Sequence, residues 1–451
     1  MGLRRSLAIL TARSLSAICR LMGKQGVTMA GSAALKIDPD ILRDLASQVR
    51  SDIVVVCGTN GKTTTNNLLC SMLESEGKKV VCNHTGSNML AGVVASFVLA
   101  ADLSGRLDAD HACIEIDEAS ARRIFPHFRP QRMVVTNLFR DQLDRYGEID
   151  ITMDLLQKAI DMAPDLQMII NADDPLSVYL ALESGRPYKT YGISQSAWGT
   201  GRGTEVREGR FCKRCGAQLE YTFYHYSQMG DYHCPQCGFA RPAPDYDADT
   251  IDMSDGLRFE VHEPAAARTI HAAYRGFYNI YNILAAYSAA RESGYELEHL
   301  DKVLDEYNPE NGRNELFHIR GTEVLLNLAK NPAGFNQNIS AVMEDRRPKD
   351  LIIVINDNAQ DGTDISWLWD VDFERLSDET VQSITVTGLR GLDMRLRLKY
   401  VNMNGELAED VRTAIEQKIE NGCGNLYVLV NYTALYGTHK ILKSMSEGTH
   451  S

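Results

Sequence analysis

The stretch DIVVVCGTNGKTTT at residues 52–65 constrains the fold of this chain more than any other part of its sequence. The valine-rich run predicts a buried strand, the glycines predict a tight turn, and the following NNLLCSMLES predicts a helix. A turn of this kind directs backbone N–H groups toward a phosphate. The sequence therefore predicts an α/β domain that binds a nucleotide through Gly58, Thr59, Asn60, Gly61, Lys62, Thr63 and Thr64.

Two side chains of this loop carry the expected chemistry. Lys62 can reach the β- and γ-phosphates of ATP, and the hydroxyl of Thr63 can hold Mg²⁺. The alternative is a turn that binds no ligand. A strand before the turn and a helix after it favour the phosphate loop over this alternative. We therefore expect a polyphosphate ligand and Mg²⁺ at this loop.

Short β-rich runs alternate with helical stretches in two parts of the chain. The first series is DIVVVC, KKVVC, HACIEI, RMVVTN and LQMIIN, and the second is TEVLLNLA, DLIIVIND, VQSITVTG and NLYVLVNY. Such alternation is typical of parallel sheets covered by helices. We expect an N-terminal helical segment over 1–45, a central α/β domain over 46–310 and a smaller α/β domain over 311–451, with the boundary at NPENGRNE, residues 308–315.

Residues 1–21 start with basic residues and continue with apolar ones, as a signal peptide does. Arg13 and Arg20 interrupt the apolar stretch at helical spacing, so an amphipathic helix fits better than a signal peptide or a membrane span. We expect this helix to pack on the first domain, and contact with a membrane surface is the alternative. The net charge of −13 argues against a nucleic-acid partner, which would need clustered Lys and Arg.

Four of the ten cysteines form a pattern. CKRC and CPQC supply Cys212, Cys215, Cys234 and Cys237, with 18 residues between the two pairs. This spacing is typical of a zinc ribbon, and four thiolates leave no open coordination position, so the metal would be structural. The alternative, two disulfides, requires an oxidising compartment, and residues 1–21 do not predict secretion. We expect a zinc ribbon over residues 205–245, inserted in the central domain.

The phosphate loop has Val56 where the common G-x4-G-K-[ST] motif has glycine. The loop GTNGKTT without this glycine resembles that of the Mur ligase superfamily, which includes the peptidoglycan stem ligases and folylpolyglutamate synthase. In IEIDEAS, the resemblance implies that Glu118 binds Mg²⁺, and Glu115 is a second candidate. VTNLFRDQLDRYG is similar to another segment of the family, but Gln142 stands where many members carry a metal-binding His.

The same resemblance implies further ATP contacts. Asn171 in NADDP would read the adenine, Asn279 lies in GFYNIYNILAA, which matches the helix that closes the central domain, and Arg313 in NGRNE would reach a phosphate. Taken from the residues alone, an Asn after a strand is more often a turn or cap residue. The common order of these segments along the chain makes the resemblance specific, and it covers residues 40 to about 450.

Three features narrow the resemblance within the superfamily. The four-cysteine insertion, NLAKNPAGFNQ at 327–337 and NDNAQDGTDISWLWDVDFE at 356–374 are similar to the synthetase subunits of lipid II isoglutaminyl synthase. This implies a cytoplasmic heterodimer with a GatD-type glutaminase, acting on lipid II at the inner face of the membrane. MgATP would activate the α-carboxyl of D-glutamate as an acyl phosphate, and ammonia from glutamine would convert it to D-isoglutamine.

The resemblance also implies that Asp364 completes the catalytic triad of the glutaminase, through a partner contact made by the C-terminal domain. From the residues alone, the aspartates and two tryptophans of this segment are equally consistent with a solvated acidic loop or an interface. Two other functions stay open: a stand-alone amino-acid ligase of the same superfamily, and a zinc-ribbon binding protein with a regulatory nucleotide site. Incorporation of ammonia that depends on ATP separates the three.

Overall fold

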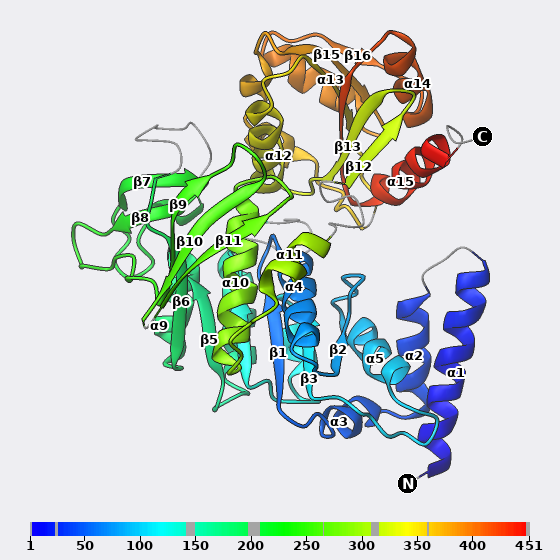
Figure 1. The fold of residues 1–451 in the computed structure, drawn as a ribbon, viewed down its shortest axis with the longest axis vertical. Helices are drawn as coiled ribbons and strands as arrows, with labels where there is room; N and C mark the ends of the chain where they lie inside the picture. Colours follow the sequence, from blue (N-terminus) through cyan, green and yellow to red (C-terminus); the bar gives the residue numbers. More distant parts are fainter. Residues whose placement is uncertain are drawn as a thin grey trace.

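The computed structural model describes residues 2–22, 26–140, 149–196, 208–264, 266–307, 315–358 and 360–447. A large α/β domain carries a group of helices at one side, and a smaller α/β domain follows at the C-terminal end (Figure 1). The α/β class predicted from the sequence is confirmed for both parts. The predicted boundary at 308–315 lies outside the described residues except for its last position.

The central domain is built on a nine-stranded sheet in the order β11-β10-β9-β6-β5-β4-β1-β3-β2. The strands from β2 to β9 in this order pair in parallel, whereas β10 pairs antiparallel with both β9 and β11. The strands are β1 (Asp52–Cys57), β2 (Val80–Cys82), β3 (His111–Glu115), β4 (Arg132–Val135), β5 (Gln167–Asn171), β6 (Tyr188–Ile193), β9 (Tyr246–Asp252), β10 (Leu257–Glu263) and β11 (Ala266–Ala272).

Helices cover both faces of this sheet, which explains why its inner strands read as continuous apolar runs. Every residue of β1 is buried, as expected for a parallel strand between two layers. One face packs against α4 (Lys62–Ser75), α10 (Tyr278–Glu292) and α11 (Leu300–Glu306). The other face packs against α5 (Leu90–Ala100), α6 (Ala121–Ile124), α8 (Ile149–Ile160) and α9 (Pro175–Ser184).

The N-terminal helices extend the second of these layers. They are α1 (Gly2–Leu21), α2 (Val27–Ile37) and α3 (Ile41–Ala46). The predicted amphipathic helix is α1, and it buries Ala8, Ile9 and Ala12 in the same core as α2 and α5. Among the described residues, no helix has the length and apolar composition needed to cross a bilayer.

The C-terminal domain has a six-stranded sheet in the order β12-β13-β17-β14-β15-β16, parallel except for the β12–β13 hairpin. Apolar cores lie on both of its faces. Its strands are β12 (Glu315–Ile319), β13 (Thr322–Leu328), β14 (Lys349–Val354), β15 (Val381–Thr387), β16 (Gly405–Leu407) and β17 (Asn425–Val430). Its helices are α12 (Pro332–Glu344), α13 (Gly391–Tyr400), α14 (Val411–Glu420) and α15 (Tyr432–Glu447), with 3-10 turns η2 (Ser366–Asp370) and η3 (Phe373–Leu376).

The cysteine-rich insertion lies between β6 and β9 of the central sheet. It begins in the described residues with a 3-10 turn η1 (Glu208–Arg210) and contains one antiparallel hairpin of β7 (Glu220–Tyr226) and β8 (Met229–His233). Cys212 and Cys215 precede β7, whereas Cys234 and Cys237 follow β8. The hairpin therefore brings the two cysteine pairs to the same end of the insertion.

Candidate functional site

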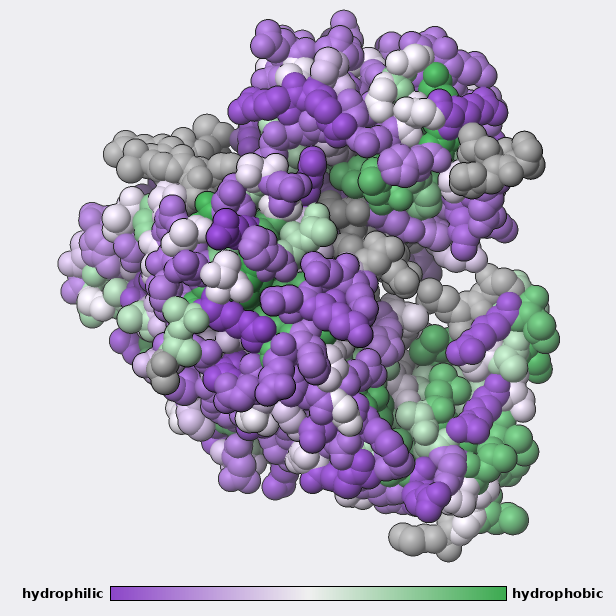
Figure 2. Space-filling model, in the orientation of Figure 1, coloured by the Kyte–Doolittle hydropathy of each residue, from purple (hydrophilic) through white to green (hydrophobic). Residues whose placement is uncertain are grey.

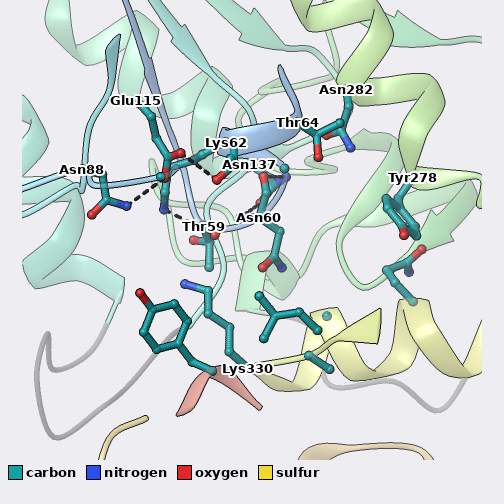
Figure 3. A pocket seen from close by; sticks show the side chains of 18 of the residues that line it. Thr59, Asn60, Lys62, Thr64, Asn88, Glu115, Asn137, Tyr278, Asn282 and Lys330 are labelled. Atoms are coloured by element: carbon teal, nitrogen blue, oxygen red, sulfur yellow. Dashed lines mark hydrogen bonds between the residues drawn. The ribbon is translucent and has the colours of Figure 1, made fainter. Parts of the chain in front are cut away.

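A cavity of about 440 Å³ lies between the phosphate loop of the central domain and the first turn of α12 in the C-terminal domain. Figure 3 shows its upper wall, made by the β1–α4 loop, by Asn88 and by α10, and its lower wall, which carries Lys330. Of the predicted loop residues, those from Thr59 to Thr64 line the cavity. The structure thus places the predicted phosphate loop in an interdomain cleft.

Two glycines give the loop its shape. Gly58 and Gly61 have φ values of 121° and 83°, which side-chain-bearing residues rarely adopt. A Cβ atom would lie 2.3 Å from the Thr136 hydroxyl at position 58 and 2.1 Å from Oδ1 of Asn282 at position 61. Glycine is therefore required at both positions by backbone conformation and by close approach of neighbouring side chains.

Lys62 and Glu118 form a buried ion pair with 3.0 Å between Nζ and Oε1. Burial lowers the pKa of Lys62, but the negative charges of Glu118 and Glu115 outweigh this effect and raise the pKa above its ordinary value. Burial raises the pKa of Glu118, and the Lys62 ammonium opposes that rise. Lys62 therefore remains charged at neutral pH, as a phosphate ligand must.

A second pair lies beside the first. The Thr63 hydroxyl donates to Oε2 of Glu115 at 2.6 Å, and the Asn88 amide donates to Oε1 of the same carboxylate at 2.8 Å (Figure 3). Mg²⁺ prefers oxygen ligands of this kind. Of the two carboxylates suggested by the sequence, Glu115 lines the cavity beside Thr63. Glu118 pairs with Lys62 and does not line the cavity. The donor set around Thr63 fits a hard cation.

The opposite wall of the cavity was not predicted from the sequence. Asn60 and Asn331 exchange two side-chain hydrogen bonds, of 3.3 and 3.1 Å, across the two domains. Asn331 also caps α12, because its Oδ1 accepts from the backbone N–H of Gly334 at 2.8 Å. Lys330 lines the cavity, and Figure 3 shows its ammonium directed toward the phosphate loop. Polar residues directly after strand β13 are the sequence signal that could have indicated this wall.

The remaining predicted ATP ligands fall in different places. Asn279 lines the cavity from the first turn of α10, where its Oδ1 accepts from the Asn282 amide at 2.9 Å. Asn171 is fully buried at the end of β5 and does not line the cavity; its amide donates to the carbonyl of Thr136. Arg313 and Gln142 lie outside the described residues.

Asp364 lies after strand β14, in the loop that leads to η2. Its side chain is half-buried, and Oδ1 accepts from the backbone N–H of Ser366 at 2.8 Å. Of the tryptophans in this loop, Trp367 packs on Phe335 of α12, whereas Trp369 is half exposed. The loop is thus anchored by one aromatic side chain and leaves a second at the surface.

The four cysteines of the insertion meet in one cluster, with their sulfur atoms within 4.8 Å of one another. Gly216 and Gly238, with positive φ, let the chain turn back so that each donates to the carbonyl of the first cysteine of its pair. The N–H of Cys237 lowers the pKa of the Cys234 thiol to about 6. Four thiols at these separations, one of them readily ionised, fit tetrahedral Zn²⁺. This cluster lies apart from the residues that line the nucleotide cavity.

The tip of the β7–β8 hairpin contacts the nucleotide site. The sequence did not predict this contact. Tyr226 at the end of β7 lines the cavity. Gln228 is completely buried, and its amide donates to the carbonyl of Leu138 at 2.7 Å and to Oδ1 of Asp174 at 3.0 Å. The insertion is therefore part of the wall of the site as well as a metal-binding unit.

A buried network fixes this arrangement. The carboxylate of Asp173 accepts from Arg241 at 2.6 Å and from the hydroxyl of Tyr281 at 2.6 Å. His225 of β7 in turn pairs with the Tyr281 hydroxyl, and burial lowers the pKa of this histidine, which favours its neutral form. Side chains from the insertion, the central sheet and α10 are thus held together by charge and by hydrogen bonds.

Comparisons with known proteins agree with this geometry. Residues 56–290 match the Mur ligase middle domain, and residues 328–435 match the MurT ligase C-terminal domain. The pseudomurein peptide ligase type C of Methanothermus fervidus has a similar fold, with a TM-score of 0.69 at 21% identity over 89% of this chain and 80% of that one. The MurF ligase of Thermotoga maritima, solved in complex with ADP, has a TM-score of 0.64 at 13% identity over 93% and 85%. The fold and the phosphate loop are those of a Mur ligase.

Two relatives match over nearly their whole length. The MurT subunit of lipid II isoglutaminyl synthase (glutamine-hydrolysing) from Staphylococcus aureus is 36% identical over 451 residues, which is 100% of both chains. The subunit of the same description from Streptococcus pneumoniae is 34% identical over 98% of both chains. The chain belongs to the family of MurT subunits of lipid II isoglutaminyl synthase.

Proposed function

We propose that this chain is the ATP-dependent synthetase subunit of a glutamine-dependent amidotransferase that converts D-glutamate of the lipid II stem peptide to D-isoglutamine. One observation carries the proposal: the cavity has a Mur-type phosphate loop on one wall and a MurT-type C-terminal domain on the other. We place this reaction in the cytoplasm, at the inner face of the membrane. The chain would act in a heterodimer with a GatD-type glutaminase.

The chemistry needs an activated carboxyl group, because a carboxylate does not accept ammonia at neutral pH. Transfer of the γ-phosphoryl group to the α-carboxylate gives an acyl phosphate, and attack by ammonia forms the C–N bond and expels phosphate. Lys62 would hold the phosphates, while Thr63 with Glu115 or Glu118 would hold Mg²⁺, which neutralises phosphate charge. Asn60, Asn279 and Arg313 remain proposed ATP contacts, whereas the burial of Asn171 outside the cavity does not support the adenine contact expected for it. Lys330 on the opposite wall is a further cation for the transferred group.

Asp364 is proposed as the third member of the glutaminase triad. A half-buried carboxylate in a loop of the C-terminal domain can accept from a histidine of a second chain, as the triad requires. The half-exposed Trp369 in the same loop supports a protein contact there. The C-terminal domain, residues 311–451, would then carry the contact with the glutaminase.

The proposed function is tested by mass spectrometry of the lipid II stem peptide after incubation with ATP, glutamine and the co-purified partner. We expect a mass decrease of about 1 Da per stem, because amidation replaces –OH with –NH2, together with release of ADP and phosphate. Addition of an amino acid in place of ammonia would instead identify a stand-alone ligase. ATP binding without any turnover would instead support the alternative of a binding protein with a regulatory nucleotide site.

A further inference from the structure

The outer face of helix α1 is apolar, and no other part of the described chain covers it. Figure 2 shows hydrophobic side chains gathered along this helix at the right of the view. They are separated by three, four or eight residues, so they share one face of the helix. Their exposed fractions are Leu3 90%, Leu7 54%, Leu10 52%, Ile18 52% and Leu21 89%. We call these five residues the α1 stripe.

The opposite face of the same helix packs against the body of the protein. Ala8, Ile9 and Ala12 are buried against α2 and α5, and Arg13 donates to the carbonyl of Ala101 at the end of α5. Arg5 pairs with Asp44 of α3. The helix is therefore held against the body of the protein, and the α1 stripe points outward. The core contacts of α1 are made by its other face.

The charge around the α1 stripe differs from that of the whole chain. Residues 1–36 contain six of the 47 Lys and Arg residues and none of the 60 Asp and Glu residues. Arg4 and Arg20 are exposed and stand next to Leu3 and Leu21, at the two ends of the stripe. The whole chain has a net charge of −13, but the α1 stripe is aliphatic and has a cationic residue at each end. Such a stripe is complementary to a bilayer with an apolar interior and anionic head groups.

We propose that the α1 stripe is a membrane-docking surface that lies in the interface of an anionic lipid bilayer. The aliphatic side chains of the stripe fit the apolar part of the bilayer interface, and the arginines at its ends fit anionic lipid head groups. Helix α2, which packs against α1, reaches the nucleotide cavity: Thr28 in its first turn lines the cavity, and the neighbouring Met29 is 58% exposed. Docking through α1 would thus bring the cavity near the bilayer that carries a lipid-linked substrate, a consequence that rests on the proposed function.

The docking itself is tested without turnover, by sedimentation of the full-length chain with vesicles. Vesicles of phosphatidylcholine with phosphatidylglycerol should bind the protein, and phosphatidylcholine alone should bind it more weakly. The triple variant Leu3→Ser, Leu7→Ser, Ile18→Ser should bind the anionic vesicles at least ~10-fold more weakly, because it removes most of the apolar area of the stripe. Arg4→Gln with Arg20→Gln should reduce the preference for anionic lipid and its dependence on salt.

A matched control is the variant Leu389→Ser, Leu392→Ser, which changes exposed leucines of the C-terminal domain and should leave vesicle binding unchanged. The α1 variants should keep the thermal unfolding temperature, since the replaced side chains are exposed. Equal binding of the triple variant and the wild type, or no binding of the wild type to anionic vesicles, would overturn the proposal. A wild-type dimer in light scattering that the triple variant abolishes, without vesicle binding, would identify the stripe as a protein interface instead.

Discussion

At the scale of single residues, Lys62 is the group whose loss should stop the reaction. The Lys62→Ala variant removes the ammonium that offsets phosphate charge, and we expect kcat/KM for ATP-dependent amidation to fall by at least ~10²-fold. The circular dichroism spectrum should be unchanged. Lys302→Ala, which removes an exposed lysine on α11, is the control and should keep full activity. Near-normal turnover of Lys62→Ala at saturating ATP would rule out the phosphate-binding role.

Asp364 provides a second residue-scale prediction. If its carboxylate orients a partner histidine, Asp364→Asn should lower glutamine-driven amidation by up to ~10⁴-fold and leave ammonia-driven amidation unchanged. The measured quantity is the ratio of the two rates in the complex with the glutaminase. Asp393→Asn, on helix α13 of the same domain, is the control and should leave this ratio unchanged. An equal loss of both rates would assign Asp364 to the ATP or acceptor site.

At the scale of elements, the insertion should behave as a metal-dependent support of the nucleotide site. Cys212→Ser should lose zinc, lower the unfolding temperature and raise KM for ATP, because the hairpin that carries Tyr226 would no longer be fixed. Metal analysis and calorimetry measure the first two effects. Cys423→Ser, outside the cluster, should keep the metal and the KM. Native protein without zinc would refute the assignment of the cluster.

The hairpin tip can be tested separately from the metal. Gln228→Ala leaves the buried carbonyl of Leu138 and one oxygen of Asp174 without this donor, which should cost about 1–3 kcal/mol of unfolding free energy. The variant should still bind zinc, because Gln228 lies away from the cysteines. If Gln228→Ala loses bound zinc as well as unfolding free energy, the hairpin tip stabilises the cysteine cluster and does not support the nucleotide site directly.

At the scale of the whole molecule, the Asn60–Asn331 pair joins the two domains across the cavity. Asn331→Asp keeps the cap of α12 but removes the amide that donates to Oδ1 of Asn60. We expect a larger radius of gyration by X-ray scattering in the absence of ATP, with little change in unfolding temperature. Asn331→Ala removes both hydrogen bonds of the pair, so it should open the cavity at least as far, and it should lose about 1 kcal/mol in addition because the cap is lost. An unchanged radius in both variants would show that other contacts hold the domains together.

The sequence by itself determined those features whose causes lie within a few neighbouring residues. The strand, glycine turn and helix around Lys62 follow from local pattern, as do the two cysteine turns, where Gly216 and Gly238 adopt positive φ. The burial of β1 on both faces is visible as an unbroken apolar run. These features were sufficient to predict the α/β class and the inserted ribbon.

Tertiary structure alone decided which side chains meet. The sequence favours Glu118 as the Mg²⁺ ligand, with Glu115 as a second candidate, and only the packing of α4 on the sheet brings Glu115 to Thr63 and Glu118 to Lys62. Lys330 lies more than 200 residues from the phosphate loop, and Gln228 belongs to the zinc ribbon, yet both contribute to the site or its support. No local pattern encodes such contacts, because they depend on how domains far apart in the chain close on one another.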